Sequence, residues 1–151
     1  MRVFPSLVVA ILLTTAYAHD AAAQTVASRR NMAFGSISGD HDLAGTVTIA
    51  TTGSKSTSGG AFNQGGTAAA AQFRVSGTAN RTVAITLPTS FNMTVSGKTI
   101  TVTNLTHDCA NPCKIASNGR IDINVGGKAT LTANQGAGSY SGTFSFTAVY
   151  N

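Results

Sequence analysis

The chain has 151 residues and a formal net charge of +5; 42% of its residues are hydrophobic and only 10% are charged. Its length fits one domain, and its hydrophobic content argues against global disorder. Average soluble proteins carry about 25% charged residues. The shortage of charge argues against a long coiled coil, whose solvent faces need Glu, Lys and Arg. All five acidic residues are Asp, so the chain has little material for paired-carboxylate catalysis.

The start of the chain has the three parts of a secretory signal peptide. Arg2 gives a positive start, residues 7–13 form an apolar run too short to span a bilayer, and small-residue cleavage motifs follow. We expect cleavage after Ala23, with Ala18 as the alternative site, which leaves residues 24–151 as one domain. A retained N-terminal anchor is the other interpretation. No later stretch is long and apolar enough for a membrane span, so the mature chain is expected in the periplasm, at the cell surface or outside the cell.

The positive net charge does not by itself indicate nucleic-acid binding. Basic residues are scattered singly from Lys55 to Lys128, and only Arg29 and Arg30 are adjacent. A nucleic-acid surface needs clustered cations together with stacking aromatic rings. Aromatic residues make up 7% of the chain and Trp is absent. We therefore expect no nucleic-acid partner.

The two cysteines, Cys109 and Cys113, enclose an Asn-Pro dipeptide, which is typical of turns. In an exported chain this pair predicts a disulfide at the tip of a hairpin. The closed loop is small, so its stabilisation should fall below the ~3 kcal/mol of a longer loop. A metal-binding or redox pair is the alternative, with His107 and Asp108 as further ligands, but the spacing is not C-x-x-C.

Hydrophobic alternation with a period of two dominates the chain and predicts β-strands. The alternating apolar positions are Val47 and Ile49; Phe73 and Val75; Val83, Ile85 and Leu87; Phe91, Met93 and Val95; Ile100 and Val102; Ile121, Ile123 and Val125; and Leu131. The last run is the longest, with Tyr140, Gly142, Phe144, Phe146, Ala148 and Tyr150 on one side. No stretch has a helical apolar stripe. Eight or nine short strands predict an all-β fold, an antiparallel β-sandwich.

Two glycine-rich stretches are expected to connect strands. Gly126-Gly127 is a two-residue hairpin signal between two alternating runs. Residues 54–71 have the Gly/Ser-rich composition of a flexible loop. Neither stretch has the pattern of a phosphate-binding loop.

The polar clusters give little support for chemistry. His41 lies between Asp40 and Asp42 and could bind a cation or act as a base, but no second ligand cluster accompanies it. We expect a solvated turn there, and likewise at His107-Asp108. The chain has no G-x-S-x-G nucleophile motif. We therefore expect no enzyme activity, no cofactor and no bound metal.

Four segments together resemble one bacterial family. They are N-M-A-F-G-S-I at residues 31–37, A-G-T-V-T-I at residues 44–49, and the longer stretches 70–88 and 131–151. The family is the domain-of-unknown-function family numbered 4402, found in exported proteins of Gram-negative bacteria. The resemblance covers nearly the whole mature chain and implies no mechanism.

The C-terminus also resembles pilins and spore-coat-U-like subunits of the chaperone–usher pathway. Those subunits end in an alternating strand with a penultimate Tyr, here Tyr150, and a Gly fourteenth from the end, here Gly138. The resemblance implies an immunoglobulin-like sandwich that takes a strand from a partner by β-augmentation. The implied assembly residues are Gly138, Gly142, Phe144, Phe146, Ala148, Tyr150 and Asn151. The implied partners are further copies or other fibre subunits, a periplasmic chaperone and an outer-membrane usher.

The chain departs from those pilins in two respects. Pilins carry an alternating donor extension, whereas residues 24–32 offer Val26 as the one large apolar residue before Met32. Pilin cysteines link distant strands, whereas Cys109 and Cys113 lie in one turn. The sequence thus favours an exported structural or adhesive subunit of a surface fibre, pilus or extracellular matrix, assembled by donor-strand complementation. The alternative is a self-contained secreted module that binds glycans or a surface partner. The sequence leaves open whether the sandwich is complete.

Overall fold

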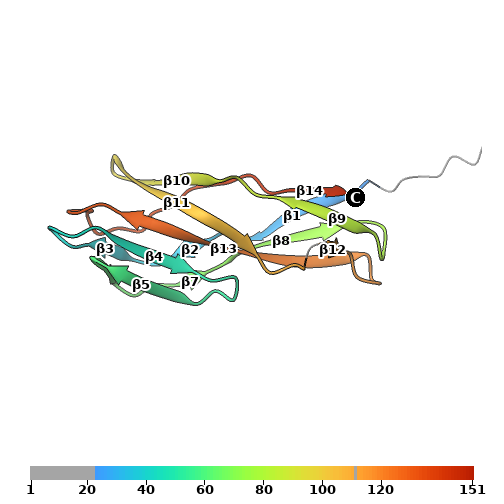
Figure 1. Ribbon diagram of the computed structural model, residues 1–151, viewed down its shortest axis with the longest axis horizontal. Helices are drawn as coiled ribbons and strands as arrows, with labels where there is room; N and C mark the ends of the chain where they lie inside the picture. Colours follow the sequence, from blue (N-terminus) through green and yellow to red (C-terminus); the bar gives the residue numbers. More distant parts are fainter. Residues whose placement is uncertain (1–22, 111) are drawn as a thin grey trace, which may run out of the picture.

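The computed structural model describes residues 23–110 and 112–151, and every regular element in them is a β-strand (Figure 1). The expected signal peptide lies outside the described residues except for Ala23. No helix in the described ranges could cross a membrane. All strand pairings are antiparallel. The predicted all-β antiparallel sandwich is confirmed, but its strands are more numerous than expected and range from 2 residues in β2 to 12 residues in β13.

The largest sheet is organised around one long strand, β13. Its seven strands are β1 (Thr25–Arg30), β4 (Gly45–Ile49), β5 (Lys55–Gly59), β8 (Ala71–Ser76), β10 (Ser90–Val95), β11 (Lys98–His107) and β13 (Arg120–Leu131). The first half of β13 pairs with β8, and its second half pairs with β4 along the same edge. Strand β11 pairs along the opposite edge and is followed outward by β10. Strands β1 and β5 lie outside β8 and β4.

Three smaller sheets accompany this large sheet. Strands β12 (Cys113–Lys114), β9 (Thr82–Thr86) and β14 (Thr147–Tyr150) form a three-stranded sheet in that order. Strand β2 (Ala33–Phe34) pairs with β7 (Ala68–Ala69), and β3 (Ile37–Gly39) pairs with β6 (Ala61–Asn63). The terminal strand β14 lies at the same end of the molecule as β1 (Figure 1).

Two buried clusters form the core. The first contains Phe34, Ile37, Val47, Ile49, Ala61, Ala70, Met93, Ile100, Val102, Ala129, Leu131 and Tyr140. The second contains Val75, Val83, Cys113, Ile115, Ile123 and Ala148. The second cluster joins the β12–β9–β14 sheet to β8 and the first half of β13. Burial of most of the alternating positions confirms the inward faces predicted from the sequence.

The hairpin predicted at Gly126-Gly127 is wrong, because β13 runs through both residues without turning. Both glycines are buried. A Cβ atom on Gly126 would overlap the carbonyl oxygen of Ile49, and one on Gly127 would lie 2.9 Å from Leu105 Cδ2. The glycines are therefore required for close approach of the neighbouring strands and not for a turn.

The flexible loop predicted over residues 54–71 is also wrong, since it contains β5, β6 and β7. Strand β1 was not expected either. All six residues of β1 are exposed, and so are four of the five residues of β5. A strand that buries neither face has no apolar alternation, so periodicity cannot reveal it.

The last alternating run forms a strand only over Thr147–Tyr150, not from Tyr140 onward as expected. Upstream, Ser141 makes a single bridge to Thr94 of β10. The chain then crosses from β10 in the large sheet to β9 in the smaller one. A segment that changes sheets cannot pair continuously with either.

Candidate functional site

Residues 142–146, which we term the crossing segment, connect the two sheets and contain unpaired backbone. The carbonyl of Ser141 accepts a hydrogen bond from Thr94 N–H at 3.1 Å, and pairing resumes at Thr147 opposite Thr86. Among the described residues, those at 143–145 form no hydrogen bond with any other group. Their peptide groups are thus available to an added strand.

Four half-buried phenylalanines, which we term the aromatic seam, lie where the segment crosses: Phe73, Phe91, Phe144 and Phe146. The Phe73 ring stacks on Phe146 with centroids 4.3 Å apart and meets Phe144 edge-on at 5.6 Å. Phe144 also stacks on Phe91 at 5.0 Å. Phe146 packs against the second core cluster, whereas Phe144 belongs to neither cluster. The alternation of Phe144 and Phe146 predicts that both are core residues. Both are only half-buried, so they belong to the seam and not to the fully buried core.

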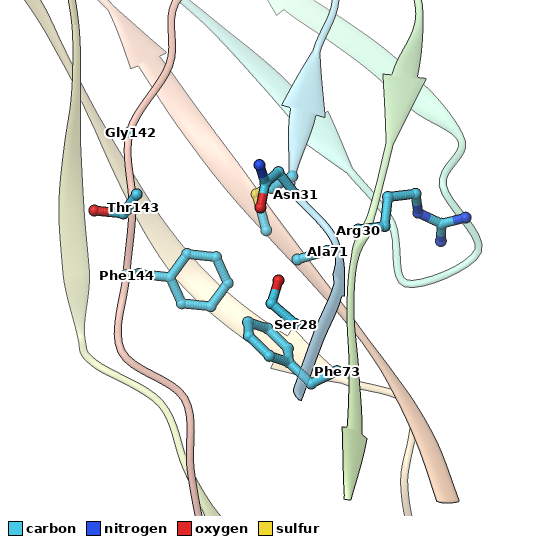
Figure 2. Close-up of a pocket in the computed structure, with 9 residues that line it drawn as sticks. Ser28, Arg30, Asn31, Ala71, Phe73, Gly142, Thr143 and Phe144 are labelled. Carbon is cyan, nitrogen blue, oxygen red and sulfur yellow. The ribbon is translucent and has the colours of Figure 1, made fainter. Parts of the chain in front are cut away.

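A groove of about 250 Å³ opens beside the aromatic seam. Its lining comes from β1 and the residues after it, from β8 and from the crossing segment: Ser28, Arg30, Asn31, Met32, Ala71, Phe73, Gly142, Thr143 and Phe144. Figure 2 shows the rings of Phe73 and Phe144 next to each other in its lining, with the Arg30 side chain directed away. Pockets for drug-sized ligands span about 300–1,000 Å³. The groove is below that range and suits one or two apolar side chains.

Strand β14 lies at the edge of its sheet and contacts the start of β1. It pairs with β9 on one side. On the other side, Gln24 Nε2 donates a hydrogen bond to the carbonyl of Ala148. The Ala148 side chain is buried in the second cluster, while Val149 on the opposite face is 49% exposed. This edge therefore presents the exposed side chain of Val149 and is contacted by Gln24, the residue directly before β1.

Tyr150 is anchored within the chain's own fold. Its hydroxyl accepts a hydrogen bond from Thr78 N–H at 2.7 Å, and the Arg81 guanidinium lies 4.9 Å from its ring centroid. The hydrogen bonds from Thr78 and the charge of Arg81 lower the pKa of Tyr150, because they favour its phenolate form. Next to it, Asn151 N–H donates to the carbonyl of Thr82 at 3.0 Å.

The structure brings together six of the seven assembly residues implied by the C-terminal resemblance. Gly142 and Phe144 line the groove, Phe146 lies in the seam, and Ala148, Tyr150 and Asn151 lie in or directly after β14. Gly142 also packs so closely on β10 that a Cβ atom would overlap Asn92 O, whereas Gly138 pairs with Ile37 and does not line the groove. The sequence did not indicate Phe73, Phe91 or β1 as site elements. Only the alternation of the two phenylalanines hinted at their burial, and it could not predict that they meet the terminal segment.

The model of one protein family, Domain of unknown function (DUF4402), matches residues 24–150. The chain belongs to the DUF4402 family. No curated protein and no solved structure shows significant similarity to it. The match extends from before β1 to the last residue of β14, so the groove and the aromatic seam lie inside the DUF4402 domain.

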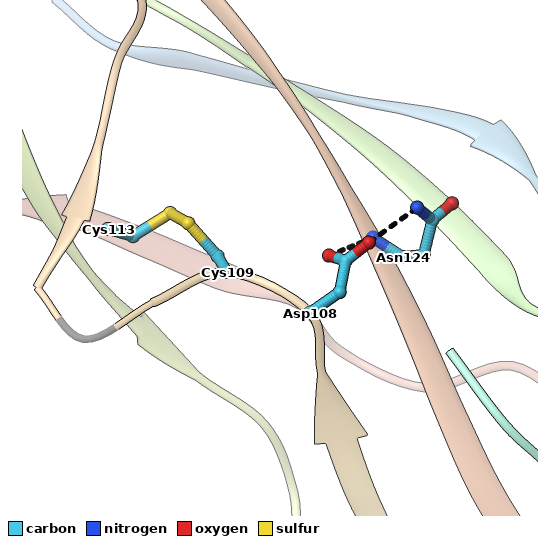
Figure 3. The surroundings of a disulfide bond; sticks show 4 residues. All are labelled: Asp108, Cys109, Cys113 and Asn124. Carbon is cyan, nitrogen blue, oxygen red and sulfur yellow. Dashed lines mark hydrogen bonds between the residues drawn. A yellow bond between two sulfur atoms is a disulfide. The ribbon is translucent and has the colours of Figure 1, made fainter. Parts of the chain in front are cut away.

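The predicted disulfide of this DUF4402 domain is confirmed. Cys109 and Cys113 are bonded, with their Cα atoms 5.5 Å apart, and the bond joins the end of β11 to β12 (Figure 3). Beside it, Asp108 accepts hydrogen bonds from Asn124 N–H at 2.9 Å and from Asn124 Nδ2 at 2.6 Å. Asp108 thereby ties the same turn to β13. One covalent bond and one carboxylate therefore fix this turn. It is not the tip of a hairpin, as predicted, because β11 pairs in the large sheet and β12 pairs with β9 in the three-stranded sheet.

The polar residues Asp40, His41 and Asp42 form an exposed turn. Asp40 Oδ1 accepts hydrogen bonds from Asp42 N–H at 2.9 Å and Leu43 N–H at 3.2 Å. His41 Nδ1 lies 2.7 Å from Asp42 Oδ1, with both side chains more than 80% exposed. Within residues 23–110 and 112–151, no group of three or more His, Cys, Asp or Glu side chains could hold a metal ion.

Proposed function

We propose that this DUF4402 domain is an exported, non-catalytic subunit of a surface fibre, pilus or extracellular matrix. In this proposal it takes a strand from a partner between β1 and the crossing segment. The supporting observation is that Thr143 and Phe144, whose peptide groups are unpaired, line the groove together with Phe73. In strand addition, main-chain hydrogen bonds give affinity and side chains entering pockets give specificity. Both requirements meet at this one place.

The donated strand is proposed to come from another subunit, after delivery by a periplasmic chaperone and an outer-membrane usher. The chain's own β1 is a suitable donor, because all six of its residues are exposed. Donation would cost β1 its backbone hydrogen bonds to β8 in its own copy, and the unpaired peptide groups at residues 143–145 of the receiving copy would replace part of them. The burial of apolar side chains would change little.

A second candidate function is a self-contained secreted module that binds a glycan or a surface partner. It is favoured by the anchoring of the terminal strand in its own chain, through Tyr150, Thr78 and the buried Ala148. A domain whose last strand is already integrated has less need of a donor.

Assembly of the mature chain distinguishes the two functions. Residues 24–151, exported by a cleaved leader, should form oligomers on size-exclusion chromatography that survive mild denaturant. Thr143→Pro removes a peptide N–H that has no partner in the fold, so the variant should stay folded and lose the oligomers. Thr143→Ala is the matched control and should assemble normally. A parent protein that elutes as a clean monomer at all concentrations would overturn the fibre-subunit proposal and favour the binding module.

A further inference from the structure

Strand β5 is an unprotected edge of the large sheet. Among the described residues it pairs with β4 alone, in the register Thr46 to Ser58 and Thr48 to Ser56. Its residues are Lys, Ser, Thr, Ser and Gly, and all but Lys55 are exposed. Proteins usually block such edges with charges, prolines or covering segments, because unpaired peptide groups form a template for another strand.

The outward peptide groups of β5 belong to Lys55, Thr57 and Gly59, of which the first two have regular strand geometry. Just beyond the strand, Gly60 N–H donates to the carbonyl of Ala44 at 3.0 Å, and Ala50 N–H donates to Ser54 at 2.9 Å. Hydrogen-bonded pairs alternate along an antiparallel ladder, so the even-numbered residues of β5 bond to β4. The N–H and C=O groups of Lys55 and Thr57 therefore point away from the sheet.

The other outer strands are less open than β5. The edge of β10 is covered by the crossing segment, since Thr94 N–H bonds to Ser141 and Gly142 packs on Asn92. Strand β1 carries the adjacent charges Arg29 and Arg30. The single cation of β5 is turned away from the edge, because Lys55 Nζ donates to the carbonyl of Phe34 at 2.9 Å.

We propose that β5 is a self-association edge, which pairs antiparallel with β5 of a second copy about a two-fold axis at Ser56. In this register, Lys55 of each copy faces Thr57 of the other, and their outward groups form four hydrogen bonds. The register uses regular backbone only, whereas an axis at Thr57 would place Gly59, with its φ of +64°, in the ladder. An isologous contact of this kind closes as a dimer.

A second copy is the occupant that fits this edge best, because the edge is self-complementary and nearly uncharged. The neighbouring strands align four residues in one row across the solvent face of the sheet: Thr103, Lys128, Thr48 and, at the edge, Ser56. Two copies would place Ser56 against Ser56 and continue this row across the junction. The strand is short, so we expect a weak, concentration-dependent dimer. The inference is independent of the proposed function, since β5 and the groove use different strands.

Single cysteine variants test the register. Opposite residues in a non-hydrogen-bonded pair have Cα atoms about 4.5 Å apart, within the range of a disulfide. Ser56→Cys should therefore form a covalent dimer under mild oxidation. Ser58→Cys is the matched control, because Ser58 is also exposed and lies on the same face of the same strand. Its two copies would lie about 14 Å apart along the paired strands. We expect at least tenfold more dimer from Ser56→Cys on non-reducing gels. Equal yields, or no dimer from Ser56→Cys, would overturn the proposed register.

Sedimentation velocity tests the dimer itself. Thr57→Pro removes an outward N–H and no bond to β4, so a folded monomer is expected, while Thr57→Ala should still dimerise. Melting temperatures of both variants check that the fold is retained. These measurements use the Thr143→Pro background, which removes strand-exchange oligomers. If the Thr143→Pro protein with an unchanged β5 remains monomeric at millimolar concentration, the inference is overturned and the proposed function is left untouched.

Discussion

Tyr150 links the end of the chain to the turn before β9, and its ionisation should reveal that link. The pKa of Tyr150 is lowered, chiefly by the hydrogen bond from Thr78 N–H. The folded state therefore releases the phenol proton more readily than the unfolded state. Between the lowered pKa of the folded state and the ordinary value of about 10, Tyr150 binds its proton more fully in the unfolded chain than in the folded one. The free energy of unfolding therefore increases with pH across this window.

Thermal melts of the parent and of Tyr150→Phe should show this dependence. The melting temperature of the parent, relative to the variant, should rise as the pH enters that alkaline window, and the gain should persist above it. A difference between the two proteins that is constant across the window would contradict the assigned role of Thr78.

At the scale of elements, the aromatic seam should contribute to stability in proportion to its partial burial. Phe146 stacks on Phe73 at 4.3 Å and contacts the second core cluster. A fully buried Phe loses about 3–5 kcal/mol on substitution by Ala. For Phe146→Ala we expect about 1–3 kcal/mol, measured by urea unfolding. The exposed Thr147→Ala serves as a control and should change stability by less than about 0.5 kcal/mol. Equal stability of Phe146→Ala and the parent would mean that the seam does not form.

The disulfide between Cys109 and Cys113 should be complete in protein purified without reductant and modest in its effect. Thiol labelling of unreduced protein should find no reactive cysteine. The sequence separation of four residues closes a very small loop, for which the chain-entropy estimate is about 2 kcal/mol. The double variant Cys109→Ser, Cys113→Ser should lose at most that amount, since Asp108 still holds the turn on β13. Two labelled thiols in the native protein would refute the bond.

The elements that bury one face were predictable, and those that bury none were not. Alternation located Val47 and Ile49 in β4 and Ile100 and Val102 in β11, since each pair points into the core. It missed β1 and β5, whose side chains stay in solvent. It also misjudged Gly126-Gly127, because a glycine that permits close packing looks the same in sequence as one that permits a turn.

The candidate site was predictable only in part, for a related reason. The terminal residues stood out through their alternation, but the groove depends on Phe73 and β1, which are distant in the chain. No local pattern reports that the segment at residues 143–145 leaves one sheet before reaching the next. Tertiary pairing alone decides which stretch of an alternating run becomes a strand.

For the whole molecule, the terminal strand offers the clearest test of assembly. Deletion of residues 148–151 removes the buried Ala148 and the anchor at Tyr150. If the chain is a fibre subunit, as proposed, the truncated chain should be degraded in the periplasm and surface assembly should be lost, as judged by immunoblotting of periplasmic and surface fractions. Truncation could act through stability alone, so the full-length chain is also expressed without a dedicated chaperone. Aggregation that a β1 peptide prevents would support strand donation, and a stable soluble monomer would contradict it.

The long strand β13 has a consequence for how the protein unfolds. It supplies Ile123 to one buried cluster and Ala129 and Leu131 to the other. If one half of β13 separates from its cluster, the hydrogen-bonded ladder of the other half is disrupted as well, because the two halves form one continuous strand. The two clusters should therefore melt in a single cooperative transition, and slow amide exchange should be matched in β8 and β4. Since each half contains an indispensable part of one common strand, the domain cannot be divided into two smaller folding units.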